Sequence, residues 1–121
     1  MLVLREPAVI MEQYFDQADA LKRIRGNQKL LNKMLELFLQ SQDPDALEQA
    51  LLQDDSAKAA QIAHAIKGVS GNLSLTLLCV VSSDLMQELR EGKCRPELLQ
   101  RYQEVLVATR DHIQEYLSQL E

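Results

Sequence analysis

Apolar residues recur at three- and four-residue steps along most of the chain. Between about residues 28 and 53 one such series contains Leu30, Leu31, Met34, Leu35, Leu37, Phe38, Leu47, Ala50 and Leu51. This spacing predicts a helix with one apolar face. Pro44 interrupts the series, so the helix either kinks there or restarts with Asp43 as N-cap and Pro44 in its first turn.

Three further helices follow, separated by short connections at 54–55, 71–74 and 92–96. Asp54 and Asp55 are typical N-cap residues for a helix that should end near Gly71 and Asn72. The next helix spans about 75 to 91, stops at Gly92, and is expected to bury Leu78, Val81, Leu85 and Leu89.

The last helix begins at Pro96, because proline is favourable at the first helical position. A heptad-like seam follows, in which an apolar residue recurs every seven positions and a second residue stands three later: Leu99, Leu106, Ile113 and Leu120, with Tyr102, Thr109 and Tyr116. Antiparallel bundles use seams of this kind.

These segments predict an all-α fold, since strand-like alternation and hairpin turns are absent from the sequence. The short connections force successive helices to fold back on each other, which predicts an up-down-up-down four-helix bundle. A shorter helix from about Phe15 to Arg25, ending at Gly26, is expected across one end. Residues 1–14 would then be an N-terminal extension and residues 15–121 one domain.

One histidine stands inside a predicted helix, in "IAHAIKGVSGNL" at residues 62–73. At about 100° per residue, one face of this helix carries Ala57, Ala60, His64, Gly68 and Gly71, and the opposite face is expected to meet the core through Ile62, Ile66, Val69 and Leu73. Glycine inside a helix costs about 1 kcal/mol relative to alanine, so the two glycines need a reason. They either leave the imidazole open to a partner or allow a neighbouring helix of the same protein to pack closely.

An open imidazole suits nucleophilic chemistry with a bulky partner. An exposed histidine is mostly neutral at pH 7 and keeps a lone pair on one ring nitrogen. In phosphoryl transfer, attacking and leaving atoms stand roughly in line, and charge on the equatorial oxygens must be stabilised. Lys67 is three residues from His64 and can bring its ammonium near those oxygens, although a solvated surface lysine is the alternative.

The stretch "AHAIKGVSGNLSL" resembles the signature of histidine-containing phosphotransfer (HPt) domains, helical bundles that relay phosphoryl groups in two-component signalling. The resemblance runs from about Phe15 to Leu120 and includes "LLNKMLELF", the acidic "QDD" turn and "LMQELREG". The motif is short but fairly specific in an all-helical chain.

The resemblance implies that His64 is the phosphoacceptor, with Lys67 as the neighbouring cation and Gly68 as the small residue that admits the partner. Ala60, Gln61 and Gly71 would complete the access and docking surface. The phosphoryl group would come from a receiver-domain aspartate of a response regulator or hybrid kinase and leave for another. The chain would be a monomeric phosphocarrier without an ATP site or cofactor of its own, and the magnesium ion would belong to the receiver.

Two positions depart from the family pattern. Ser74 stands where many members have glycine, two residues before the next helix. Met86 stands where many members have a Gln or Glu that hydrogen-bonds the imidazole. A thioether is a weak acceptor, so either Gln87 or a water orients the ring, or the ring is held less firmly.

Composition and charge limit the class of protein, the kinds of partner and the cellular location that we expect. Hydrophobic residues make up 46% and charged residues 26% of 121 residues, as in an ordinary globular domain. The formal net charge of −5 argues against nucleic-acid binding. Cys79 and Cys94 lack the spacing of a disulfide framework or zinc site, which favours a reducing cytoplasm. The N-terminal residues, interrupted by charges and Pro7, resemble neither a signal peptide nor a membrane anchor.

The remaining predictions concern His112, Arg90 and a second class of function. His112 lies beside the last seam without small neighbours, so we expect a surface or boundary role for it, and no metal site. Arg90 either helps to dock an acidic receiver or complements the dipole at a helix end. A different function class is a helical docking protein whose histidine is never phosphorylated and whose small-residue face binds a partner helix.

Overall fold

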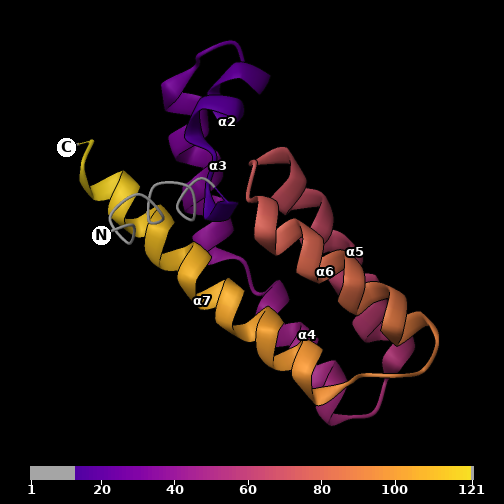
Figure 1. Ribbon diagram of the computed structural model, residues 1–121. Coiled ribbons are helices and arrows are strands. Elements are labelled where there is room, and N and C mark those ends of the chain that lie inside the picture. Colours follow the sequence, from indigo (N-terminus) through magenta and orange to yellow (C-terminus); the bar gives the residue numbers. More distant parts are fainter. Residues whose placement is uncertain (1–12, 121) are drawn as a thin grey trace, which may run out of the picture.

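A computed structural model describes residues 13–120, which contain helices and no strand. The helices are α2 (Gln17–Arg23), α3 (Gln28–Gln40), α4 (Asp43–Leu52), α5 (Ser56–Asn72), α6 (Thr76–Arg90) and α7 (Pro96–Ser118) (Figure 1). The predicted extension at residues 1–14 lies almost wholly outside the described residues, and only its last two residues fall inside them.

The bundle has the predicted up-down-up-down course. Helices α3 and α4 run in the same direction as one interrupted arm, and α5, α6 and α7 then alternate in direction (Figure 1). Helix α5 packs against α4 on one side and α6 on the other, and α6 also packs against α7. The predicted short helix across one end is α2, whose preceding residue Asp16 donates its N–H to the Ser74 carbonyl at 3.0 Å.

The first arm ends and restarts at Ser41–Gln42, so the restart was the correct alternative. The N-cap of α4 is Gln42, and Asp43, the predicted cap, is the first helical residue. Ser41 has extended backbone, and its Oγ accepts the N–H of Asp43 at 3.2 Å. Pro44 lies in the first turn of α4, where its missing N–H costs no intrahelical hydrogen bond.

The core lies between the four arms, and leucine is its commonest residue. The predicted buried residues of α6, Leu78, Val81, Leu85 and Leu89, are all at most 2% exposed. The seam predicted for α7 is confirmed except at its end: its members up to Tyr116 are buried or pack half-buried against the core, but Leu120 is exposed. Val105, outside the predicted seam, is buried. A straight helix drifts by about 20° per heptad, so a strict seven-residue series leaves the buried face, which follows Tyr102, Val105, Thr109 and Ile113.

Ser74 joins the end helix to the bundle. It has a φ of 58°, in the left-handed region that favours glycine, and it is buried. Its hydroxyl donates to Asp19 Oδ2 at 2.6 Å, and the Arg23 guanidinium pairs with the same oxygen at 2.9 Å. The serine that departs from the family's glycine thus provides a side-chain contact with α2.

The Asp19 contact predicts a pH effect. The hydrogen bond from Ser74, followed by that from Arg23, lowers the pKa of Asp19 below its ordinary 3.8. A lowered folded-state pKa stabilises the fold above about pH 5, and that stabilisation is lost as pH falls through the folded-state pKa. Ser74→Gly removes the largest cause, so the variant should lose less stability than wild type between about pH 5 and pH 2. Melting temperatures across this range, with an NMR titration of Asp19, test this, and identical pH profiles would contradict it.

Candidate functional site

Helix α5 carries the histidine and is fixed at both ends. Asp55 caps its start, where Oδ1 accepts the N–H of Lys58 at 3.1 Å. The helix runs through Gly68 and Gly71 and ends at Asn72, as predicted. Its buried face is made largely of small side chains, Ala59, Ala60, Ala63 and Ser70, which allow close packing against α4 and α6.

The predicted core face of α5 needs correction. Ile66 and Leu73 are buried as expected and Ile62 is half-buried against the core, but Val69 is 41% exposed. Ala60, expected on the open face beside His64, is buried. The cause is that α6 covers the side of α5 next to Ala60, while the side next to Val69 has only the end of α3 nearby.

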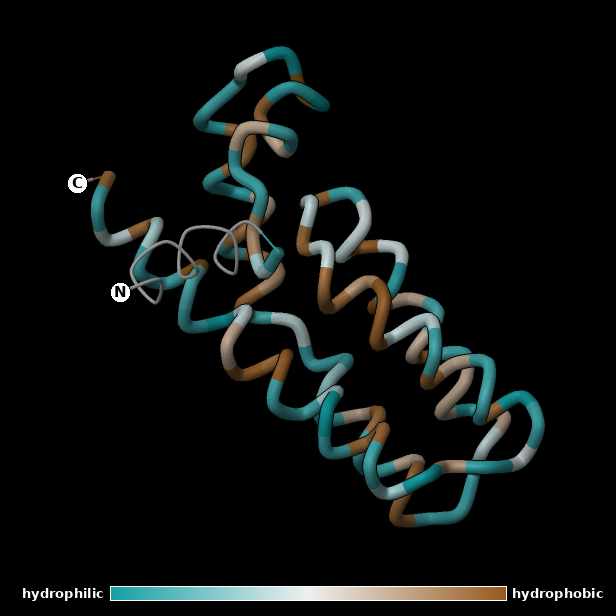
Figure 2. Tube along the Cα trace, in the orientation of Figure 1, coloured by the Kyte–Doolittle hydropathy of each residue, from teal (hydrophilic) through white to brown (hydrophobic). Residues whose placement is uncertain are grey.

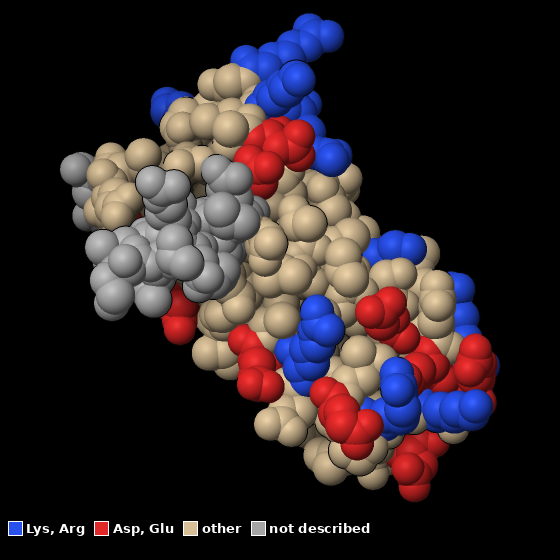
Figure 3. Space-filling view, in the orientation of Figure 1, with Lys and Arg blue, Asp and Glu red and all other residues tan. Residues whose placement is uncertain are grey.

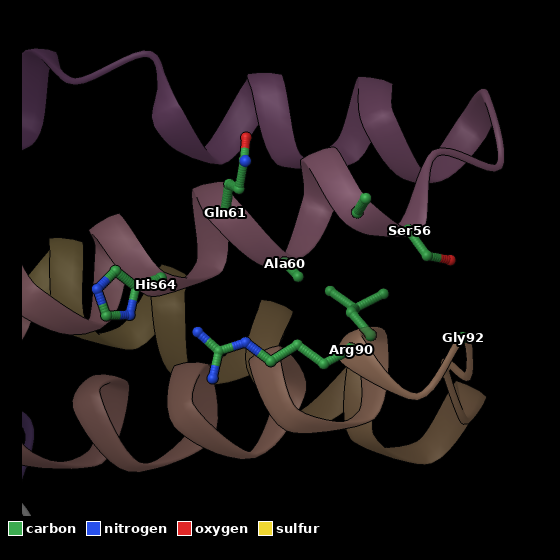
Figure 4. A pocket seen from close by; sticks show the side chains of 8 residues that line it. Ser56, Ala60, Gln61, His64, Arg90 and Gly92 are labelled. Carbon is green, nitrogen blue, oxygen red and sulfur yellow. The ribbon is translucent and has the colours of Figure 1, made fainter.

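His64 is exposed at the edge of a pocket between α5 and α6. The pocket has a volume of about 530 Å³ and is lined by Ser56, Ala57, Ala60, Gln61, His64, Leu89, Arg90 and Gly92. Its wall is largely apolar near Ala60 and Leu89, and the imidazole stands at one end of it (Figure 4). The arrangement leaves the ring accessible and gives a partner an apolar surface directly beside it.

Gly68 lies one turn after His64 and faces open space. A Cβ built on Gly68 would have no atom within 4 Å, so close packing inside the protein does not require glycine there. At Gly71 a Cβ would meet Cys79 Sγ at 3.6 Å, which is an ordinary contact. Close packing of a neighbouring helix, the alternative reading of this face, therefore applies to Ala60 and not to Gly68.

Two cations lie near the ring, and no carboxylate of the sequence falls between Asp55 and Asp84. Lys67 is half-buried on α5. Arg90, in the last turn of α6, is exposed and extends its guanidinium along the pocket toward His64 (Figure 4). Within residues 13–120 neither cation forms an ion pair. Both are therefore available to an anionic group at the imidazole.

Met86 and Gln87 of α6 are the two side chains at the positions predicted to orient the ring. Met86, on α6, is 4% exposed, and Gln87 is exposed. Among the described residues, neither His64 nor Gln87 takes part in a side-chain hydrogen bond, so the ring orientation is not fixed by a protein partner in this state. Gln61 lines the pocket, as a docking residue would.

His112 lies elsewhere in the fold. It is half-buried on α7 and stacks on Tyr14, with ring centroids 4.9 Å apart, which confirms the predicted boundary position. Residues 13–120 contain no cluster of three His, Cys, Asp or Glu side chains that could hold a metal ion. Within the same range no helix is long and apolar enough to cross a membrane.

The structure is thus a helical bundle with an accessible histidine on its surface, beside two cations that form no ion pair among residues 13–120. The sequence matches the Hpt domain family over residues 10–121, and the chain belongs to that family. Members of the family act in histidine phosphotransfer and interact with receiver domains, as phosphocarriers rather than enzymes with an ATP site. No curated protein and no solved structure gives a significant match to the chain.

Proposed function

We propose that His64 accepts a phosphoryl group from the aspartyl phosphate of a receiver domain and passes it to the aspartate of a second receiver. The observation that carries this proposal is the exposed ring with open space over Gly68. A receiver active site must come within bonding distance of the ring nitrogen, and a side chain at position 68 would stand in its approach. The chain needs no nucleotide for this exchange.

The transfer step follows from the chemistry of the two groups. The lone pair of one ring nitrogen attacks phosphorus, the bond from phosphorus to the aspartate oxygen breaks, and that oxygen leaves as a carboxylate. The other ring nitrogen keeps its proton throughout. Charge on the three equatorial oxygens would be stabilised by the cations of Lys67 and Arg90 and by the receiver's own magnesium ion. The next receiver reverses the step.

The test is transfer of labelled phosphate from a phosphorylated receiver to this protein. We expect label that is lost in acid and stable in base, as for a phosphorus–nitrogen bond. Proteins that only dock a partner helix would bind the receiver without acquiring label. Binding without label, across receivers that phosphorylate other Hpt domains, would favour that alternative.

Met86→Gln tests how the ring is held. If Met86 lies beside the imidazole, the amide oxygen accepts the ring N–H, fixes one tautomer and leaves the other nitrogen free. One neutral hydrogen bond contributes about 0.5 to 1.5 kcal/mol, so transfer or phosphohistidine lifetime should rise by at most roughly tenfold.

The control for Met86→Gln is stability, because this position is 4% exposed. A buried amide without a partner costs about 1 to 3 kcal/mol. An unchanged melting temperature with a longer lifetime supports the hydrogen bond. A lower melting temperature with unchanged transfer and lifetime would contradict it and leave Gln87 or water as the orienting group.

A further inference from the structure

Charge is divided unevenly along this acidic chain. Between Asp19 and Glu36 the sequence has five cations and no carboxylate: Lys22, Arg23, Arg25, Lys29 and Lys33, here named the basic corner. The chain as a whole has a formal net charge of −5. A positively charged segment in an acidic protein points to an anionic partner.

The basic corner forms the exposed end of the molecule. The turn between α2 and α3 projects past the turn between α5 and α6 (Figure 1), and Lys and Arg side chains gather at that end (Figure 3). All five side chains belong to exposed residues. Arg23 pairs with Asp19 at 2.9 Å, and the other four form no ion pair within residues 13–120. Four positive charges are thus free to meet a partner.

Arg25 is held in a backbone conformation that arginine rarely adopts. Its φ is 57°, and Gly26 follows with a φ of 75°. The turn is closed through the backbone, where Gly26 N–H donates to the Leu21 carbonyl at 2.7 Å. A glycine would fit this conformation with less strain, so the turn geometry does not explain the arginine side chain.

An apolar groove adjoins the corner along α3. It has a volume of about 290 Å³ and is lined by Met34, Leu37, Phe38, Ser41, Val69, Asn72 and Leu73. Leu37 is 54% and Val69 41% exposed, although both were expected to face the core. Asn72, which also lines the groove, follows His64 and Gly68 at four-residue steps, and all three residues are exposed, so the groove borders the face of α5 that carries His64.

We propose that the basic corner and the α3–α5 groove form a second docking surface for an acidic segment of the partner receiver, and this inference rests on the proposed function. An interface of standard size covers about 800 Å² per partner, or roughly 30 Å across. Asn72 of the groove is eight residues, or about 12 Å along α5, from His64, so one interface can include both. The unpaired cations of the corner complement carboxylates in charge, so an acidic segment of the receiver is the expected occupant. The tip of the corner is hydrophilic (Figure 2), and the apolar side chains beside it line a groove rather than one open helix face, which favours a protein segment over an anionic membrane.

Two variants test the corner against a matched control. Lys33→Glu should lower kcat/KM for transfer from a receiver by about five- to tenfold at low ionic strength, through KM with kcat unchanged. The difference in kcat/KM between Lys33→Glu and wild type should shrink to within about twofold at high salt.

Arg25→Gly should lower kcat/KM by about two- to threefold without lowering the melting temperature, because glycine relieves the strain of the left-handed backbone at this position. Arg101→Glu, an equal charge change at an exposed residue of α7, should stay within about twofold of wild type.

A small phosphodonor separates this inference from the proposed function. Phosphoramidate labels histidine without a docking surface, so both corner variants should accept phosphate from it as wild type does. If wild type takes no phosphate from any receiver, the proposed function fails. If wild type is labelled and Lys33→Glu keeps the same KM and salt dependence, the corner does not dock the receiver. If the corner variants lose binding to vesicles with anionic lipids while their transfer from a receiver is unchanged, the corner is a membrane surface and the inference is overturned.

Discussion

Replacing His64 with glutamine should reduce phosphate acceptance by about a thousandfold or more, because the amide nitrogen has no free lone pair to attack phosphorus. The fold should remain intact. His64 is exposed, and no hydrogen bond of its side chain joins it to the other described residues, so the free energy of unfolding should change by no more than about 0.5 kcal/mol. Acid-labile label from a phosphorylated receiver and the melting temperature are the two measurements.

The matched control for His64→Gln is His112→Gln. His112 is half-buried and stacks on Tyr14, so this variant should lose some stability and keep full phosphate acceptance. Label retained in the His64 variant and mapped to His112 would refute the assignment of the phosphoacceptor. Loss of label in both variants, with both still folded, would point to a damaged docking surface.

Gly68→Gln should separate stability from transfer. A Cβ at this position meets no atom within 4 Å, so the side chain fits without displacing the core. Glutamine has a higher helix propensity than glycine, which should stabilise the fold by about 0.5 kcal/mol and leave the melting temperature equal or higher. Transfer from a receiver should fall by at least about tenfold, because the added side chain lies one turn from the imidazole and occupies the partner's approach.

Gly68→Ala is the control for side-chain size. It gains helix propensity but adds only one carbon, so it should keep transfer within a few-fold of wild type. Labelling by phosphoramidate should be nearly normal in both variants, since a small donor needs little room. A normal transfer rate in Gly68→Gln would show that open space over this residue is not required by the receiver.

The fold could be predicted because local signals mark nearly every helix end. Asp55 caps α5, Gly92 ends α6 with a φ of 74°, and Pro96 begins α7. The two alternatives at Pro44 could not be separated, since proline is compatible with both a kink and a first turn. What decides between them is the extended backbone at Ser41, which no local sequence signal marks.

The sequence predicts the part of the candidate site that lies on α5, but not the part that depends on how α5 and α6 pack together. The spacing of His64, Lys67 and Gly68 places them on α5 without knowledge of the neighbours. A helical wheel does not show where α6 approaches, so Ala60 was expected to be open and is buried, and Arg90 was left with two alternatives. Val69 is exposed for the same reason, because only the end of α3 approaches its side of α5, and an apolar side chain in a helix is not by itself evidence of burial.

The exposed position of His64 at the middle of a capped helix determines how this protein would carry a signal. A phosphoryl group added there displaces no core side chain and meets no carboxylate along α5. We therefore expect the loaded and empty forms to share one backbone, with the message stored in the presence of a single phosphorus–nitrogen bond. Receivers would then recognise the phosphoryl group itself rather than a change of shape in this bundle, and the signal would last only as long as the phosphorus–nitrogen bond.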